Sequence, residues 1–397
     1  MTHRYIFFLI LGVDALILLF QTSQLSISYE EASLLYGDFS FLQLLIKASL
    51  SVLGNNEIGL RFVMIIFHIA SAILMYEISK EYIKHDRDRL WLLLVFILLP
   101  GVVSAALIIN SAGILIFGIL LFIYLNKRVS QIYLNGVLFL LSLLDIGFAY
   151  LFLGLSVYYI LHKKMKIFIY MISLYLLTSF LYGFEVAGSP RGHFLDTLGV
   201  YGVIFTPIIF IYLFYSLYRR YITAKEDMIW YIASTVLILS LLLSFRQRMP
   251  LEHFAPYLIV ALPLAAQSFI SSYRVRLRVY RRSYKMAFVL SFIFLISNTL
   301  LVFFNEELYT FTNNPKHHFA YENNIAKELA DKLEKKGIKC LNTDEKMQIR
   351  LQFYGIKYCE DVELKEVPLK SKKASSVTIS YKSIPLYRAN VTILNNI

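Results

Sequence analysis

The sequence predicts an all-α polytopic membrane protein with about eleven transmembrane helices and a small C-terminal α/β domain. Its 397 residues are 58% hydrophobic, with a mean hydropathy of +0.60, and a soluble domain of this size could not bury so much apolar surface. The apolar residues form runs of about 15 to 20, close to the length that crosses a hydrocarbon core. Because these runs lack the alternation of barrel strands, helices must satisfy the backbone hydrogen bonds.

The expected spans are separated by polar segments. They cover residues 5–20, 58–79, 90–109, 112–125, 131–144, 147–161, 167–183, 200–217, 228–245, 257–271 and 286–304. The four short segments between 90 and 161 also fit broken or re-entrant helices. The first span lacks an Ala-x-Ala-like cleavage site, so we expect a retained helix and no cleaved signal peptide.

The distribution of Lys and Arg predicts a cytoplasmic N-terminus. With this orientation the inside segments hold nineteen Lys and Arg residues, and the outside segments before residue 304 hold five, namely Lys47, Arg61, Arg191, Arg246 and Arg248. An odd number of spans then places the C-terminal domain in the periplasm of a bacterium whose inner membrane holds the chain. The net charge of +12 is therefore a topology signal, and no nucleic-acid partner is expected.

Two domains are expected, a transmembrane domain over 1–304, which includes an outer loop at 21–57, and a soluble α/β domain over 305–397. In the tail, Ile325, Leu329 and Leu333 have helical spacing. A second helix is expected near 344–354, and "IKCL", "IKYC" and "SVTISY" are strand-like. Cys340 and Cys359 occupy the same place in two of these runs, which fits either a disulfide in an oxidising compartment or two buried thiols.

The outer loop contains a helical pattern of its own. The stretch "FSFLQLLIKASLSVLG" places Phe41, Leu44, Leu45, Ala48 and Val52 on one helical face. This pattern fits an amphipathic helix in the membrane interface, and it fits equally a helix packed on neighbouring spans. Either arrangement makes the loop a lid at the outer surface.

The motif "YEEA" at residues 29–32, followed by "LGNNEIGLRF" at 53–62, resembles the first outer loop of the GT-C membrane glycosyltransferases. The similarity is to the branch that includes the lipid A aminoarabinose transferases and the protein mannosyltransferases. The resemblance implies a GT-C fold and an active site that faces the periplasm. It also implies that the first carboxylate of the loop, Glu30, lies at the reaction centre.

A physical argument also favours Glu30. Inverting transfer of a sugar from a lipid phosphate needs a group opposite the leaving phosphate that receives the acceptor's proton, and a carboxylate at a dry interface suits this role. Glu31 points elsewhere on a helix. We expect it to anchor the loop and group it with the substrate-binding candidates.

The donor's phosphate requires cationic partners, and Arg matches phosphate oxygens best. The segment "SFRQRMPLEHFAPYLIVALPL" supplies Arg246, Arg248 and His253 just outside a span, and it resembles the segment of the family that meets the lipid phosphate. The alternative is that these are outer-loop charges that contact lipid headgroups. In the loop "FEVAGSPRGHFLDTLGVYG", Arg191 and His193 are expected to contact acceptor or sugar, although a solvated connector explains this loop equally well.

The sequence departs from the family at three points. Asn110, in "LIINSAGIL", stands where the family has a second acidic residue, and an amide is neither a base nor a good metal ligand. The loop has Glu for Asp, and "FSFLQ" replaces the usual Pro-Pro. No cofactor or metal is therefore assigned, and a divalent ion has only weak support. An altered acceptor or a loss of activity would produce similar changes.

The preferred hypothesis is a hexosyl or pentosyl transferase. Its donor is a polyprenyl-phosphate sugar, and its acceptor is a lipid-linked glycan, a lipid A-like molecule or a protein. The alternatives are a transporter or flippase of a lipid-linked substrate, which would show inverted repeats and midplane polar groups, and an inactive membrane scaffold.

Overall fold

The chain divides into two compact units in the computed structural model, which describes residues 2–183, 192–312, 314–368, 376–382 and 384–393. The first unit comprises Met1–Ile17 and Met64–Thr299, and the second comprises Leu18–Val63 and Leu300–Ile397. The outer loop thus belongs to the same unit as the C-terminal residues, whereas the sequence grouped it with the transmembrane domain. The boundaries fall within three helices, α1 (Thr2–Gln24), α4 (Glu57–Ser79) and α16 (Arg278–Phe303).

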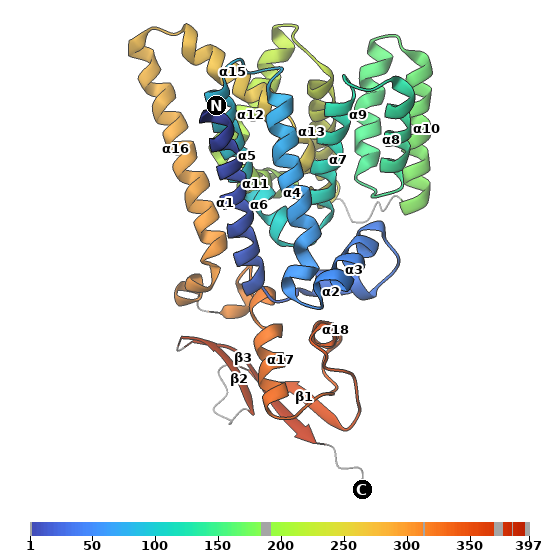
Figure 1. Ribbon diagram of the computed structural model, residues 1–397, viewed down its shortest axis with the longest axis vertical. Coiled ribbons are helices and arrows are strands. Elements are labelled where there is room, and N and C mark those ends of the chain that lie inside the picture. Colours follow the sequence, from blue (N-terminus) through green and yellow to red (C-terminus); the bar gives the residue numbers. More distant parts are fainter. Residues whose placement is uncertain (1, 184–191, 313, 369–375, 383, 394–397) are drawn as a thin grey trace. The chain divides into compact units, whose positions relative to one another are not determined.

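Helices alone form the described part of the first unit (Figure 1). Besides the parts of α1, α4 and α16 that it contains, they are α5 (Asp86–Ile97), α6 (Pro100–Leu107), α7 (Ser111–Leu125), α8 (Gln131–Ser142), α9 (Phe148–Leu161), α10 (Met165–Tyr182), α11 (Phe194–Phe205), α12 (Pro207–Ile222), α13 (Met228–Ser244), α14 (Leu251–Ile259) and α15 (Leu262–Val275).

The apolar helices identify a multi-pass membrane protein. Within the described residues five helical segments are long and apolar enough to cross a membrane, and the number rises to seven if each of two bent pairs forms one span. Every segment expected as a span is helical, but α7, α8, α9 and α13 are shorter than a full crossing. The figure of about eleven spans stays a prediction.

Two of the expected spans are bent. The α5–α6 pair bends by 59° within the region where broken helices were expected. The prediction of one continuous helix over 200–217 is wrong, because α11 and α12 meet at 105°. Thr206 has a φ of 62° there and Pro207 follows it, so a residue outside the helical region and a residue without an N–H together interrupt the hydrogen-bond ladder.

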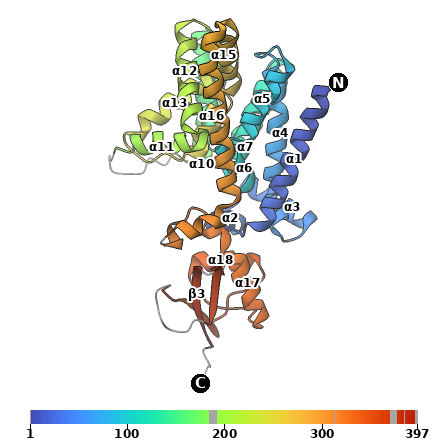
Figure 2. The same ribbon diagram turned by 90° about the vertical axis from the view of Figure 1, so that its left-hand side faces the viewer.

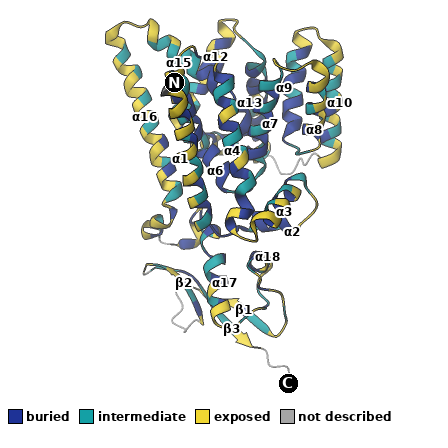
Figure 3. Ribbon diagram, in the orientation of Figure 1, coloured by how far each residue is buried: buried dark blue, intermediate teal, exposed yellow. Residues whose placement is uncertain are grey.

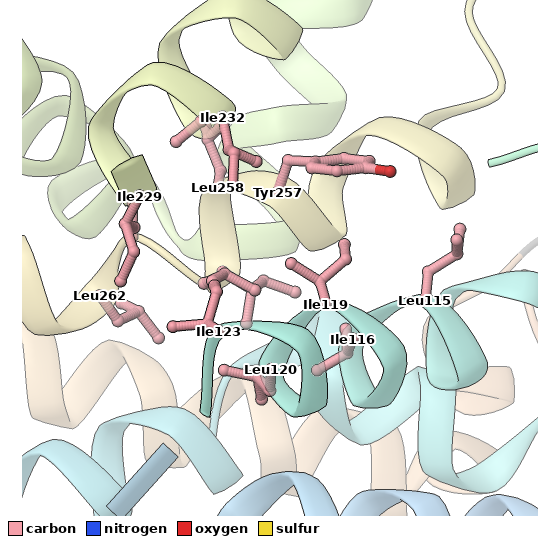
Figure 4. Close-up of a cluster of buried hydrophobic side chains, with 14 of the residues drawn as sticks. Leu115, Ile116, Ile119, Leu120, Ile123, Ile229, Ile232, Tyr257, Leu258 and Leu262 are labelled. Carbon is pink, nitrogen blue, oxygen red and sulfur yellow. The ribbon is translucent and has the colours of Figure 1, made fainter. Parts of the chain in front are cut away.

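Buried apolar side chains of α7 form the centre of the first unit. Leu115, Ile119 and Leu120 of α7 are fully buried, and they pack with side chains of α13 and α14 such as Ile232 and Leu258 (Figure 4). A helix that is apolar on all sides needs such an enclosed position.

Many residues of α10 and α16 are exposed (Figure 3), among them apolar residues such as Phe180 and Ile293. In their most hydrophobic windows only 17% and 11% of residues are buried within the protein, so lipid must cover them. Asp14 of α1 contacts His68 of α4 at 2.7 Å between Oδ2 and Nε2, which joins the two helices.

The second unit combines the outer loop with the tail (Figure 2). Besides the ends of α1, α4 and α16, its elements are α2 (Tyr29–Tyr36), α3 (Phe41–Leu53), α17 (Ala326–Lys335), α18 (Glu345–Phe353), the strands β1 (Val362–Glu366), β2 (Val377–Tyr381) and β3 (Ile384–Ile393), and the short 3-10 helices Asn305–Phe311, Pro315–His317 and Glu322–Asn324. The strands form an antiparallel sheet in the order β1-β3-β2.

The tail has the predicted α/β character. Ile325, Leu329 and Leu333 are all fully buried in one core with the sheet, and α18 lies where the second helix was expected. "SVTISY" forms β2, but "IKCL" and "IKYC" are not strands; one parallel bridge joins Cys340 to Lys357. The two cysteines form a disulfide, which resolves the choice between a disulfide and free thiols.

Helix α3 turns a different face to its neighbours than the sequence pattern indicated. Leu42, Ile46 and Leu50 are buried, whereas Leu44 and Val52 of the predicted stripe are exposed. Gln43 is buried too, because its amide donates to the carbonyls of Leu35 and Gly37 at 3.1 and 3.0 Å. The exposed stripe therefore remains available for the membrane interface.

Candidate active site

The two adjacent glutamates of the outer loop have opposite environments. Ser28 is the N-cap of α2, and its hydroxyl accepts from the Glu31 N–H at 3.2 Å while the Glu31 carboxylate accepts from the Ser28 N–H at 3.0 Å. This reciprocal capping box satisfies two N–H groups at the start of the helix. It fixes Glu31 on the inner side of α2, where it is fully buried.

Arg61 neutralises the buried Glu31. The guanidinium Nε and Nη2 contact the two carboxylate oxygens at 2.7 and 2.6 Å, so the pair is bidentate. The remaining donors reach the carbonyls of Leu25 and Ser26, both at 2.8 Å. Because both charges have no solvent exposure, this contact anchors the chain that leads into α2, and Glu31 has the environment of an anchoring group more than of a ligand-binding group.

Glu30 is the second residue of the same helix, and its side chain is exposed. The carboxylate makes no hydrogen bond or ion pair with the residues that the structure describes, while the residues on both sides of it are fixed. The protein around Glu30 does not desolvate it, in contrast to the dry environment expected from the sequence. Glu30 is thus an exposed carboxylate on a helix whose first turn is held by the capping box and by Arg61.

A second polar cluster, which we call the Asp145 cluster, lies in the first unit and consists of Ser111, Asp145, Glu252 and His253. Ser111 donates to Asp145 Oδ2 at 2.6 Å, and the N–H of Gly147 donates to Oδ1 at 2.7 Å. His253 Nδ1 is 3.4 Å from Oδ1, an ion-pair separation outside hydrogen-bond geometry, and its Nε2 is 3.7 Å from Glu252.

Helices α7 and α14 and the turn before α9 supply this cluster. Asn110 is the N-cap of α7 and accepts from the Gly113 N–H at 3.4 Å, which places Ser111 at the start of that helix. Asp145 precedes α9, and His253 belongs to α14. The hydroxyl of Tyr257 donates to the Gly147 carbonyl at 2.6 Å and ties α14 to the Asp145 turn.

The charge of Asp145 is supported by its neighbours. Burial acts to raise the pKa of this carboxyl, but His253, the Ser111 hydroxyl and the Gly147 N–H outweigh burial and hold the pKa below its ordinary value. Asp145 is therefore ionised at neutral pH. It supplies a carboxylate that is bound by Ser111, the residue after Asn110, although the sequence places an amide at the position where the family has an acid.

The predicted phosphate ligands follow α13. Arg246 and Arg248 are exposed, and their guanidinium groups make no hydrogen bond or ion pair within the described part of the chain. The N–H of His193 donates to the Ser244 carbonyl at 3.0 Å, and the rings of Phe194 and Phe245 stack at 4.9 Å. His193 thus lies beside the segment that carries Arg246, whereas Arg191 lies outside the described residues.

Sequence reasoning assigned no role to Asp145, Ser111 or Tyr257. A lone Asp in the apolar stretch "LLSLLDIGF" was the available signal, since an acidic residue among apolar neighbours must find polar partners or water. The partners themselves come from α7 and α14, which are distant in sequence. Among the described residues no group of three or more His, Cys, Asp and Glu side chains is arranged to hold a metal ion.

The long apolar helices and the shorter helices between them form a multi-pass membrane fold. Two solved structures of the aminoarabinose transferase ArnT from Cupriavidus metallidurans share this fold. The apo structure aligns with a TM-score of 0.60 at 12% identity over 90% of this chain and 86% of that chain. The structure bound to undecaprenyl phosphate aligns with a TM-score of 0.55 at 11% identity over 88% and 85% of the two chains.

These alignments confirm, at the level of the fold, the resemblance that the outer loop indicated. No protein-family model matches the chain, and no curated protein matches it by sequence.

Proposed function

We propose that the chain is an inner-membrane glycosyltransferase that moves a sugar from a polyprenyl-phosphate carrier to an acceptor at the periplasmic face. The observation that carries the proposal is the shared fold over nine-tenths of the chain with a transferase that has been solved with undecaprenyl phosphate bound. The exposed Glu30 on its fixed helix supports it, as do Arg246 and Arg248, which are exposed and have no partner among the described residues.

The proposed reaction is an inverting displacement. The acceptor oxygen attacks the anomeric carbon from the face opposite the phosphate, and Glu30 takes the acceptor's proton. The bond between the anomeric carbon and the phosphate oxygen breaks, and its electron pair leaves with the polyprenyl phosphate. Arg246 and Arg248 stabilise the charge on this leaving group.

The periplasmic location of the second unit is part of the proposal. The Cys340–Cys359 disulfide supports it, because disulfides persist in oxidising compartments. The excess of Lys and Arg on the opposite side of the predicted topology supports the same orientation.

The Asp145 cluster provides the second set of site groups. We assign its ionised carboxylate and His253 to orienting the acceptor or the sugar, with Asn110, His193 and Arg191 as further polar contacts. This assignment replaces the missing acid at Asn110 with a carboxylate from the turn before α9.

The experiment uses purified full-length protein in lipid nanodiscs, a panel of radiolabelled polyprenyl-phosphate sugars, and membrane acceptors. Glu30→Gln is expected to lower kcat by about 100- to 10,000-fold with little change in KM for the donor. Glu334→Gln is the matched control, because it makes the same change on an exposed face of α17. Undiminished transfer by Glu30→Gln would remove Glu30 as the base, and absence of transfer by the wild type with every donor would favour a transporter or scaffold.

A further inference from the structure

Helix α18 of the tail binds the backbone just before Glu30. Arg350 is buried in this helix, and its Nε donates to the Ile27 carbonyl at 3.0 Å. Tyr354, directly after the helix, accepts from the Ile27 N–H at 3.1 Å. Both the N–H and the carbonyl of Ile27 are therefore hydrogen-bonded to side chains that lie more than 300 positions later in the sequence.

The neighbouring peptide groups are held by the same part of the tail. The Ser26 N–H donates to the Asn323 carbonyl at 2.8 Å, and the Tyr29 N–H donates to the Glu322 carboxylate at 3.2 Å. Arg350 also donates to the Glu322 carbonyl. Since the Ser28 N–H is bound by Glu31, every N–H from Ser26 to Tyr29 has a fixed partner.

This degree of fixation is unusual for a loop, because connecting segments ordinarily leave many backbone groups to water. Arg61 binds the carbonyls of Leu25 and Ser26, and Arg350 binds the next carbonyl along. Arg61 and Arg350, which are far apart in the sequence, thus bind three successive carbonyls with their buried guanidinium groups. Glu30 follows three residues after Ile27 and takes its direction from this segment.

The disulfide encloses the helix that makes these contacts. Cys340 and Cys359 are 19 residues apart in sequence, and the segment between them contains the whole of α18 together with Tyr354. The Lys357 N–H donates to the Lys339 carbonyl, and the Leu341 N–H donates to the Lys357 carbonyl, both at 3.0 Å. The disulfide and these two backbone hydrogen bonds therefore hold the two ends of the segment 340–359 together.

We propose that α18 is the positioning element for the Glu30 carboxylate, with Arg350 and Tyr354 as positioning residues. The inference rests on the proposed function, since it gives the tail a role in the same reaction. The C-terminal domain then belongs to the catalytic machinery, because it holds the backbone whose displacement by about 1 Å would remove the base from its acceptor.

The test uses Arg350→Lys and Tyr354→Phe in the full chain, with Glu345→Gln as a control on the exposed face of α18. Arg350→Lys is expected to lower kcat by about 10- to 100-fold with less than a twofold change in donor KM. Hydrogen exchange of the Ser26–Tyr29 amides is expected to speed up by at least about tenfold in both variants. Glu345→Gln is expected to match the wild type in both measurements.

A double-variant cycle distinguishes positioning from a general loss of structure. If Arg350 acts through Glu30, then Arg350→Lys causes no further loss of kcat in a Glu30→Gln background. Equal losses in both backgrounds, or wild-type amide exchange in Arg350→Lys, would overturn the inference. Absence of transfer by the wild type would instead count against the proposed function, while the exchange measurement would still show whether α18 holds the segment.

Discussion

The buried pair between Glu31 and Arg61 allows a quantitative prediction. Glu31→Gln preserves the shape of the side chain but leaves the Arg61 guanidinium fully buried without a counter-charge. Breaking a buried pair in this way costs about 3–5 kcal/mol. Because the amide oxygen of Gln still accepts one hydrogen bond, we expect the lower value of about 3 kcal/mol for local unfolding of α2.

Arg61→Met is expected to cost more. It leaves the Glu31 carboxylate buried and also removes the donors to the Leu25 and Ser26 carbonyls, so we expect about 5 kcal/mol. In the double variant neither charge remains. Its cost should therefore fall short of the sum of the single costs by about 2–3 kcal/mol.

Hydrogen exchange of the amides in α2 is the appropriate assay, because it reports local opening and does not require reversible unfolding of the whole membrane protein. A cost of 3 kcal/mol corresponds to roughly 100-fold faster exchange. Glu328→Gln is the matched control, since it breaks the half-exposed pair between Glu328 and Lys332 on α17 and should change stability by less than about 0.5 kcal/mol. Two results together would refute the view that this pair anchors the loop. They are an increase in exchange rate of less than about tenfold in each single variant, and additive effects in the double variant.

Three further predictions concern other parts of the molecule. Replacing Cys340 and Cys359 by Ser opens a loop that spans 19 residues and should destabilise the C-terminal domain by about 3 kcal/mol, measured as a shift of its exchange rates relative to the oxidised wild type; equal rates would show that the disulfide adds no stability. Arg246→Gln should lower kcat/KM for the donor by about 10- to 100-fold and Arg246→Lys by less, with Arg128→Gln as a surface control; equal kinetics in Arg246→Gln would place the donor phosphate elsewhere. Burial lowers the pKa of His318, which accepts from the Ala320 N–H through Nδ1, so the folded domain holds it neutral; stability should be constant above about pH 7 and decline as the pH falls below about 6.5, the ordinary pKa of His, because protons then favour the unfolded state. His318→Asn should abolish that part of the decline, and an unchanged pH profile of the unfolding free energy would contradict the assignment.

The candidate site was predictable from the sequence only where local chemistry sufficed. The pattern Ser28-x-x-Glu31 is a capping box that one turn of helix makes by itself. The ion pair between Glu31 and Arg61 could not be predicted from the sequence, because helix α3 lies between the two residues. The sequence identified Arg61 only as one of the charges outside the membrane. The Asp145 cluster was hidden for the same reason, since its groups come from two helices and a turn that are separated by long stretches of chain.

The contact between α18 and the loop shows the limit most clearly. Arg350 lies in a polar helix, with Tyr354 directly after it, and the sequence of this helix indicates an ordinary surface element. Only the folded second unit reveals that Arg350 is buried on the Ile27 carbonyl. Local propensity carries no information about which distant backbone group a long side chain will reach.

By itself, the sequence determined that this chain is a helical membrane protein, because apolar runs of membrane length can satisfy their backbone only as helices. It also determined the α/β character of the tail, through hydrophobic spacing that depends on neighbouring residues alone. Only the tertiary structure decided which of the adjacent carboxylates is anchored and which is available, and that a disulfide closes around α18. These outcomes depend on contacts between residues far apart in the chain, whose free energies are not encoded in any local pattern.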